Sequence, residues 1–132
     1  MELAEVTNEE ISDPEIRARD VTSSRCAHTR HFIAIEAGSE VGLLSVDLLP
    51  TDERFVIYEI FVPTALRRRG IGGILLQTAE GMAKDWGYES TLLVPKSLDN
   101  AFEQRTLEEW YARKGYIPID DAANGAVAKR IV

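Results

Sequence analysis

A run of arginine and glycine residues is the part of this sequence best suited to bind an anion. The run reads Arg67, Arg68, Arg69, Gly70, Ile71, Gly72 and Gly73. Glycines lack a Cβ and let a ligand approach the backbone, and the amides at a helix N-terminus attract negative charge. Where water is excluded, each hydrogen bond from an arginine to an anion contributes about 1.5 to 3 kcal/mol. The run therefore predicts a diphosphate site, and the alternative interpretation is a solvated basic turn.

Two common phosphate-binding motifs do not fit this run. The dinucleotide-binding pattern GxGxxG would require glycine at the position of Leu75, and the GxxxxGK pattern of phosphate-binding loops is absent. The pattern that fits is Arg-x-x-Gly-x-Gly, formed by Arg67, Gly70 and Gly72.

The elements on either side of the run must position it. Residues 55–62 are rich in β-branched and aromatic side chains and predict a central strand. Apolar residues then recur every three or four positions, which predicts an amphipathic helix over residues 71–86. Gly81, inside that helix, indicates close packing against a neighbour. Residues 90–94 predict a buried strand, and residues 103–114 predict a second helix.

Short elements are predicted at both ends of the chain, and together with the central ones they form a mixed α/β layer. The expected fold class is α/β (α+β), with a mixed central sheet flanked by helices. The terminal elements are a strand at 3–7, a helix at 14–21, a hairpin of strands 31–36 and 41–48, and two short strands around Asp120–Asp121 and Asn124–Gly125.

Composition limits the function classes. The 132 residues, 45% hydrophobic and 28% charged, fit one globular domain over residues 1–132. A net charge of -7 disfavours nucleic acid and anionic membranes as partners and favours cations. A single Cys26 and two histidines, His28 and His31, lack metal-ligand spacing, so we expect no metal. The acidic start and the lack of a long apolar stretch predict a cytoplasmic location.

Two motifs together resemble the GNAT superfamily of N-acetyltransferases. The first is the Arg-x-x-Gly-x-Gly pattern between a strand and an amphipathic helix, which is similar to the family's acetyl-CoA-binding motif. The second is similar to the family's Leu-Tyr-x-x-x-Gly-[Phe/Tyr] signature and reads Trp110, Tyr111, Ala112, Arg113, Lys114, Gly115 and Tyr116. The resemblance covers roughly residues 30–130 and implies the GNAT acyl-CoA N-acyltransferase fold.

The resemblance implies roles for particular residues. The cofactor's pyrophosphate is expected on the amides of residues 67–73, and its pantetheine arm along the strand backbone at Ile60, Phe61 and Val62. Val62 is also the expected amide donor to the acetyl oxygen. Tyr111 corresponds to the family's general acid, which protonates the departing thiolate. Gln104 stands where relatives often have an asparagine that contacts the cofactor or a water.

The general base is the least defined role. An alkyl amine with a pKa near 10.4 is protonated at neutral pH, so the site must accept a proton. Glu59 is the candidate because it is a carboxylate in an otherwise apolar strand. Glu59 could instead be a strand residue that faces solvent or that pairs with an arginine. A water chain could then serve as the base in its place. His28 and His31 are expected to be surface or strand residues, although either could line the acceptor site.

The resemblance implies an acetyl-CoA-dependent N-acetyltransferase that acts by direct transfer to a primary amine. The acceptor is a small amine or a protein amine, and the resemblance also allows a homodimer. The alternative from another class is a GNAT-like module that binds acyl-CoA as a sensor or interaction domain without turnover. A nucleic-acid-binding role for the arginine run is disfavoured by the net charge.

Overall fold

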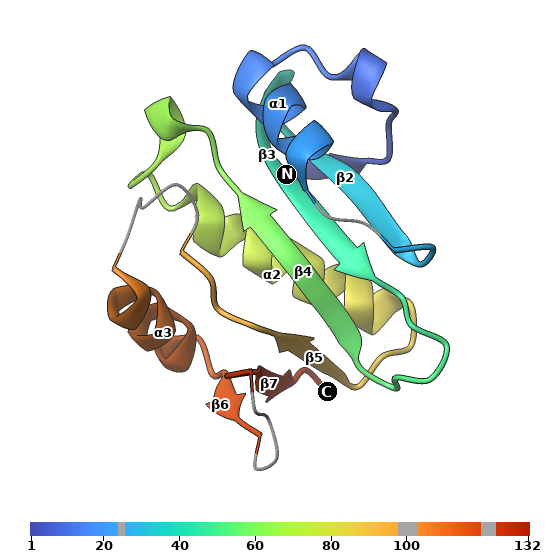
Figure 1. Cartoon of the computed structure of the whole chain (residues 1–132), viewed down its shortest axis with the longest axis vertical. Coiled ribbons are helices and arrows are strands. Elements are labelled where there is room, and N and C mark those ends of the chain that lie inside the picture. The colour runs from blue at the N-terminus through green and yellow to red at the C-terminus, as the bar shows by residue number, and fades with distance from the viewer. Residues whose placement is uncertain (24–25, 98–102, 120–123) are drawn as a thin grey trace.

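The computed structural model describes residues 1–23, 26–97, 103–119 and 124–132, and their strands form one mixed sheet. The sheet has seven strands in the order β1-β2-β3-β4-β5-β7-β6 (Figure 1). All pairings are antiparallel except that of β4 with β5. The strands are β1 (Glu2–Ala4), β2 (Thr29–Glu36), β3 (Ser39–Asp47), β4 (Phe55–Phe61), β5 (Ser90–Leu93), β6 (Ile117–Pro118) and β7 (Val127–Arg130).

Helices cover both faces of the sheet. The α-helices are α1 (Pro14–Thr22), α2 (Ile71–Asp85) and α3 (Gln104–Arg113), and two short 3-10 helices are η1 (Asn8–Glu10) and η2 (Thr64–Leu66). Helix α2 lies behind the sheet and α1 in front of it (Figure 1). The larger core cluster joins α2 to the sheet, and a smaller cluster lies under α1. That smaller cluster contains Ile11, Ile16, Ile33, Leu43 and Phe61.

Local sequence explains where several elements begin and end. The Asp13 side chain accepts a hydrogen bond from the Ile16 amide at 2.9 Å, and Pro14 opens α1 at the position predicted for it. Between β2 and β3, Ala37 and Gly38 both have positive φ angles, 51° and 80°. This is the conformation of a two-residue hairpin turn that matches the strand twist. The predicted hairpin is therefore confirmed, with strands longer than predicted.

A β-bulge divides β4 into two parts that face opposite ways. Ser45 pairs with Glu59 and the next residue of β3, Val46, pairs with Ile57, so Tyr58 is the extra residue. Because side chains alternate along a strand, one extra residue reverses the face of all that follow. Phe55 and Ile57 consequently join the core under α2, whereas Phe61 joins the cluster under α1.

Some predictions from sequence were wrong. The first strand is Glu2–Ala4 rather than residues 3–7. Gly81 is exposed and a Cβ there would meet nothing within 4 Å, so it makes no close packing contact. The tail strands observed are β6 and β7, which pair antiparallel, and Asn124–Gly125 lies in their connection, as expected of a hairpin turn, rather than in a strand. Asp120 and Asp121 lie outside the described residues.

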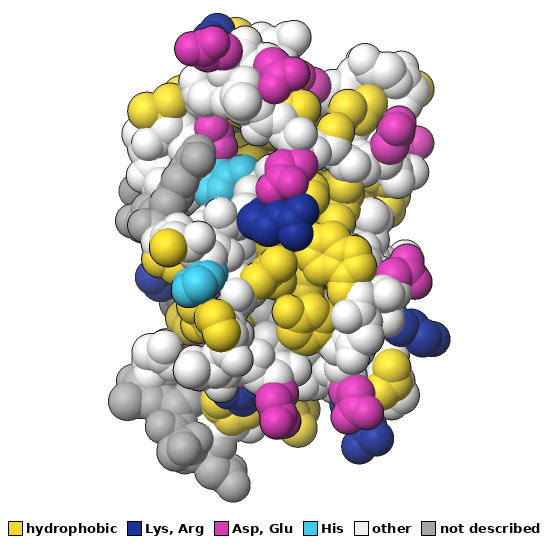
Figure 2. Space-filling model, turned by 90° about the vertical axis from the view of Figure 1, so that its right-hand side faces the viewer, with side chains coloured by type: hydrophobic (Ala, Val, Ile, Leu, Met, Phe, Trp, Pro, Cys, Tyr) yellow, Lys and Arg dark blue, Asp and Glu magenta, His cyan; other side chains and the backbone are white. Residues whose placement is uncertain are grey.

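The side of the molecule at the right of Figure 1 carries apolar side chains at its surface. Figure 2 shows apolar side chains gathered there beside a basic and an acidic one. Trp86, at the end of α2, is 43% exposed and its ring centroid lies 6.2 Å from that of Phe32. The Arg30 guanidinium lies 5.1 Å from the Trp86 ring and forms an ion pair with Glu5. This arginine therefore covers part of the apolar surface.

Candidate active site

The main cavity lies where β4 and β5 separate. Their parallel pairing ends at Ile57 and Leu93, although β4 continues to Phe61, so the last residues of β4 have no partner in β5. Figure 1 shows the chain after β5 diverging from β4 toward α3. A cavity of about 300 Å³ opens there, bounded by Ile60, Phe61 and Val62 on one side and by α3 on the other. The carboxyl end of β4 thus presents backbone to a pocket of ligand size.

The start of α2 forms one wall of this cavity. Gly70, Ile71, Gly72 and Gly73 all line it. Gly70 adopts the left-handed conformation with φ of 78° and provides no side-chain cap for the helix. The first amides of an α-helix have no partner within the helix, so those of α2 remain available to an anion.

Positive charge is concentrated at the cavity. Arg67, Arg68, Lys96 and Arg113 line it, and no acidic residue is found among its described lining residues. Arg69 does not line it. Arg67 folds back on the strand end, where its Nε donates to the Val62 carbonyl at 2.8 Å and its guanidinium lies 5.5 Å from the Phe61 ring. A protein with a net charge of -7 thus has a basic, partly apolar pocket.

Tyr111 lies between the main cavity and a second, smaller one. It lines both. Its side chain packs edge-on against Trp110, with ring centroids 4.9 Å apart, and against Tyr116 at 5.8 Å. Burial raises the pKa of Tyr111 to about 12, so the phenol is protonated across the neutral range.

The Gly-Tyr end of the signature has a structural explanation. Gly115 has a φ of 99°, and the Tyr116 amide donates to the Tyr111 carbonyl at 3.1 Å, which closes the end of α3. The chain turns back at this point and Tyr116 enters the core. There the hydroxyls of Tyr116 and Thr91 are hydrogen-bonded at 2.7 Å, and that of Tyr116 also donates to Glu80 at 2.8 Å.

Gln104 lies away from both cavities. Its side-chain amide donates to the Pro95 carbonyl at 2.7 Å, and its side-chain oxygen accepts from the Ser97 amide at 3.0 Å. These bonds tie the first residue of α3 to the chain that follows β5. Gln104 therefore holds the wall of the main cavity in place, and the structure does not bring its side chain to the predicted cofactor position.

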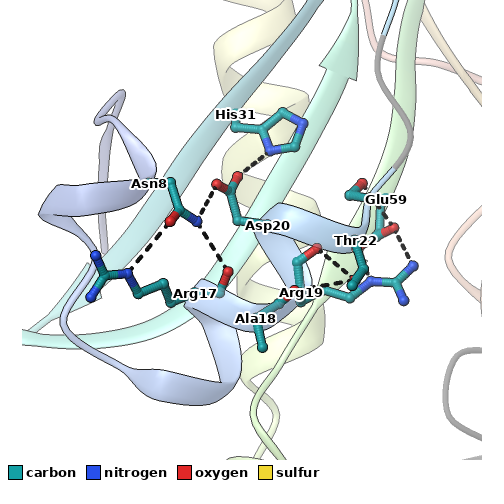
Figure 3. Close-up of polar contacts among 9 residues, drawn as sticks. Asn8, Arg17, Ala18, Arg19, Asp20, Thr22, His31 and Glu59 are labelled. Atoms are coloured by element: carbon teal, nitrogen blue, oxygen red, sulfur yellow. Dashed lines mark hydrogen bonds and ion pairs between the residues drawn. The ribbon is translucent and has the colours of Figure 1, made fainter.

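The second cavity, of about 140 Å³, contains the predicted base. Glu59 lines it and is 8% exposed. Both of its oxygens accept hydrogen bonds from Arg19 of α1, at 2.7 Å each (Figure 3). The Ser23 hydroxyl lies 3.4 Å from the same carboxylate. Of the alternatives left open by the sequence, pairing with an arginine is the one observed.

The two histidines differ in surroundings. His28 is exposed, whereas His31 is 7% exposed and its Nδ1 lies 2.5 Å from the Asp20 carboxylate (Figure 3). Neither lines a described cavity. Within the described ranges no group of three or more histidine, cysteine or acidic side chains is placed to hold a metal ion. The helices of these ranges include none with the length and hydropathy to cross a membrane.

Sequence reasoning missed three charged residues of the site: Arg19, Lys96 and Arg113. Arg113 was assigned only to the helix end, although the helical period places it beside Trp110, three residues earlier, which also lines the main cavity. Lys96 follows the strand that diverges from β4. In the sequence, a basic residue at that position was only a weak signal of an anion site. Nothing in the sequence connects Arg19 to Glu59, forty positions later.

Comparison with known proteins agrees with this geometry. Residues 27–118 match the model of the acetyltransferase (GNAT) domain family. No curated protein sequence matches the chain significantly.

Solved structures show the same fold at low sequence identity. A GNAT family acetyltransferase from Elizabethkingia anophelis with acetyl-CoA bound has a TM-score of 0.65 and 16% identity, covering 98% of this chain and 97% of its own. An IAA acetyltransferase from Bacillus cereus has a TM-score of 0.62 and 18% identity, with 97% of each chain covered. A PaiA N-acetyltransferase from Thermoplasma acidophilum in complex with coenzyme A has a TM-score of 0.59 and 14% identity, covering 88% of this chain and 67% of its own.

The fold class expected from the sequence is thereby confirmed. The family match includes the arginine and glycine run and the tyrosine signature, which border one cavity. The chain belongs to the GNAT acetyltransferase family.

Proposed function

We propose that this protein transfers an acetyl group from acetyl-CoA directly to a primary amine. The observation that carries the proposal is that Tyr111 lines two cavities of different character. The larger cavity is basic and suits a long anionic donor. The smaller cavity contains the Glu59 carboxylate beside Arg19 and Lys96, and it is proposed to take the acceptor amine. A group held between them reaches both substrates, which is what direct transfer requires.

The donor is proposed to lie along the open side of β4. The amides at the start of α2 and the side chains of Arg68 and Arg113 would hold its phosphates. On the side of β4 that has no partner in β5, the backbone at Ile60, Phe61 and Val62 would bind its amide-containing arm, as an added strand binds a sheet edge. An acetyl thioester bound this way supplies an activated carbonyl, whose oxygen the Val62 amide is proposed to stabilise.

Tyr111 is proposed to act on the departing sulfur. With a pKa of about 12, it keeps its proton until the thiolate forms. A free thiol has a pKa near 8.5, so complete transfer would be uphill by about 5 kcal/mol if the thiol kept that value. Apolar surroundings raise the thiol pKa as well. The hydroxyl is therefore proposed to stabilise the leaving sulfur by donating a hydrogen bond to it as the C–S bond breaks.

The second candidate function is acyl-CoA binding without turnover. One observation favours it: both oxygens of Glu59 are already engaged by Arg19, so the proposed base is not freely available. The two functions share the main cavity and differ at the smaller one.

The test combines calorimetry with a free-thiol assay. We expect acetyl-CoA to bind at micromolar concentration and thiol to appear when amines are added from a panel of amino acids, polyamines, aminoglycosides and peptides. Tyr111→Phe should lower kcat by about 100-fold or more, within the range of acid–base contributions, with binding unchanged. Tyr88→Phe is the control, since Tyr88 lines neither cavity. Tight binding without thiol release from any amine would support the second candidate.

A further inference from the structure

A row of buried polar side chains crosses three strands beneath α1. His31 pairs with Ser45, and Ser45 pairs with Glu59, so the three side chains stand on one face of β2, β3 and β4. Their residues are 7%, 0% and 8% exposed. Paired residues on neighbouring strands have Cβ atoms about 4.5 to 5.5 Å apart. Buried polar residues in such a line are unusual in a sheet core and require a physical reason.

Two atoms in the row have no hydrogen-bond partner. His31 Nε2 and Ser45 Oγ are buried and find no partner among the described residues. A buried polar atom without a partner costs about 1 to 3 kcal/mol. Two such atoms on paired residues can share one water, which needs two to four polar partners. The geometry points to a bound water between them.

The two ends of the row are charged. At one end Asp20 lies 2.5 Å from His31 Nδ1, and Asn8 donates to the same carboxylate group at 2.9 Å (Figure 3). Because a carboxylate only accepts, Nδ1 carries the hydrogen, and in the neutral ring Nε2 then has the lone pair. At the other end Glu59 borders the smaller cavity. Among the described residues, the charged groups that face the row are Arg19 and Asp20 of α1, Asp47 of β3 and Glu59 of β4. Lys96 lines the smaller cavity together with Glu59.

We propose that Glu59, Ser45, one water and His31 form a relay that carries the acceptor's proton from the smaller cavity to the His31–Asp20 pair. The proposal rests on the proposed acetyl transfer. Protonating Glu59 would break one of its two charge-assisted bonds to Arg19, so the proton needs a further resting place. His31 provides one, because Asp20 stabilises the imidazolium that forms.

The neutral amine's nitrogen forms a bond to the acetyl carbon and loses one proton to Glu59. The C–S bond breaks, and its electron pair leaves on sulfur as the coenzyme A thiolate, to which Tyr111 donates a hydrogen bond. The Ser45 hydroxyl has no partner among the residues that the structure describes, so it must first turn toward Glu59, its neighbour on β4. It then takes that proton and gives its own to the water, which gives one to His31 Nε2. After the product leaves, the same path returns the proton to the smaller cavity and solvent. Ser45 and His31 touch neither substrate and are positioning residues.

Ser45→Ala is the decisive variant. If the hydroxyl were a structural accident, removing a buried group without a partner would leave stability equal or higher and activity unchanged. The relay instead predicts that kcat falls at least tenfold, with acetyl-CoA affinity within twofold of wild type. Ser39→Ala, an exposed serine on the same strand, is the matched control.

His31→Gln tests the other end of the relay. It should lower kcat by a similar factor and displace the acid limb of the kcat–pH profile, which a purely structural change would not move. Members of one relay act as a unit, so the double variant His31→Gln/Ser45→Ala should lose no more than the worse single variant. His28→Gln, at an exposed position, should leave the profile as in wild type.

A high-resolution crystal structure gives a readout besides activity. Ordered density for a water within hydrogen-bond distance of both His31 Nε2 and Ser45 Oγ supports the relay, and an empty gap overturns it. A wild-type protein that releases no thiol with any amine contradicts the proposed function and, with it, the proton transfer. If Ser45→Ala turns over as fast as the wild-type protein, that result contradicts the relay but not the proposed acetyl transfer.

Discussion

Arg19 and Glu59 form a two-point ion pair across the face of the sheet, with Nε and Nη2 of the arginine each 2.7 Å from a different carboxylate oxygen. The carboxylate side chain is 6% exposed and the arginine 25%. The bulge at Tyr58 makes this pair possible, because it turns Glu59 toward α1. The helix and the central strand are therefore joined by charge at the edge of the smaller cavity.

Removing Arg19 should destabilise the fold. In Arg19→Gln the Glu59 carboxylate would stay buried without its cation, and we expect the free energy of unfolding to fall by about 2 to 3 kcal/mol, below the range for fully buried pairs because the arginine is partly exposed. The double variant Arg19→Gln/Glu59→Gln should recover part of that loss. Urea denaturation measures both.

Arg105→Gln is the matched control for this prediction. Arg105 pairs with Glu109 at 3.4 Å on the surface of α3, where the two side chains are 88% and 57% exposed. We expect Arg105→Gln to change the free energy of unfolding by less than about 0.5 kcal/mol. Equal effects at Arg19 and Arg105 would show that the Arg19–Glu59 pair contributes no more than a surface pair.

Gly42 should not tolerate a larger residue. A Cβ at this position of β3 would lie 3.0 Å from Leu75 Cδ2 and 3.1 Å from the Phe61 carbonyl oxygen. Gly42→Ala would press on both α2 and the end of β4, and overpacking of this kind costs about 1 to 3 kcal/mol. Thermal unfolding should show the lower stability, and acetyl-CoA affinity should fall because Phe61 borders the main cavity.

The same substitution at Gly81 should have the opposite effect and raise the stability of the fold. Gly81 lies inside α2 with open space around its missing Cβ. Alanine in a helix interior is favoured over glycine by about 1 kcal/mol, so Gly81→Ala should raise the unfolding temperature. A loss of stability at Gly81, or none at Gly42, would contradict the packing described for α2.

Alkaline pH should destabilise the protein through its buried tyrosines. Burial raises the pKa of Tyr111 to about 12 and that of Tyr116 higher still, whereas an unfolded tyrosine ionises near 10. Above about pH 10 the unfolded chain therefore binds fewer protons than the folded one, and stability falls as pH rises. Each tyrosine contributes a slope of up to about 1.4 kcal/mol per pH unit until its folded pKa is reached.

Tyr111→Phe provides the check on this slope. Urea midpoints measured between about pH 8 and pH 11 should decline less steeply in the variant than in wild type, because one ionising group has been removed. The difference should vanish below about pH 9, where both states keep the phenol proton. Identical slopes would show that Tyr111 is not buried in its neutral form.

Local signals in the sequence predicted most of the fold and one wall of the site. Asp13 and Pro14 predicted the start of α1, and the glycine-containing turn after residue 36 predicted the β2–β3 hairpin. The arginine and glycine run predicted the start of α2, because turn and helix preferences act over a few residues. These elements needed no knowledge of distant contacts.

The acceptor side of the site could not be predicted in this way. The apolar run at 55–62 gives no sign of the extra residue at Tyr58, and that bulge decides which face Glu59 joins. The path of α1 brings Arg19 to Glu59, and strand register aligns Ser45 and His31 with Glu59 on one face of the sheet. Register depends on side-chain packing across the whole sheet, and a single sequence window contains no measure of it.

Gly72→Ala should separate donor binding from stability. Gly72 lies in the first turn of α2 and lines the main cavity, and a Cβ there would meet no protein atom within 4 Å. The fold should therefore tolerate the methyl group, whereas a ligand resting on the helix amides would be pushed away from them. We expect coenzyme A to bind at least tenfold more weakly in calorimetry, with an unfolding temperature no lower than wild type. Gly81→Ala is the control, since it adds the same methyl group to the same helix outside the cavity, and equal coenzyme A affinity in the two variants would show that the phosphates do not bind at the start of α2.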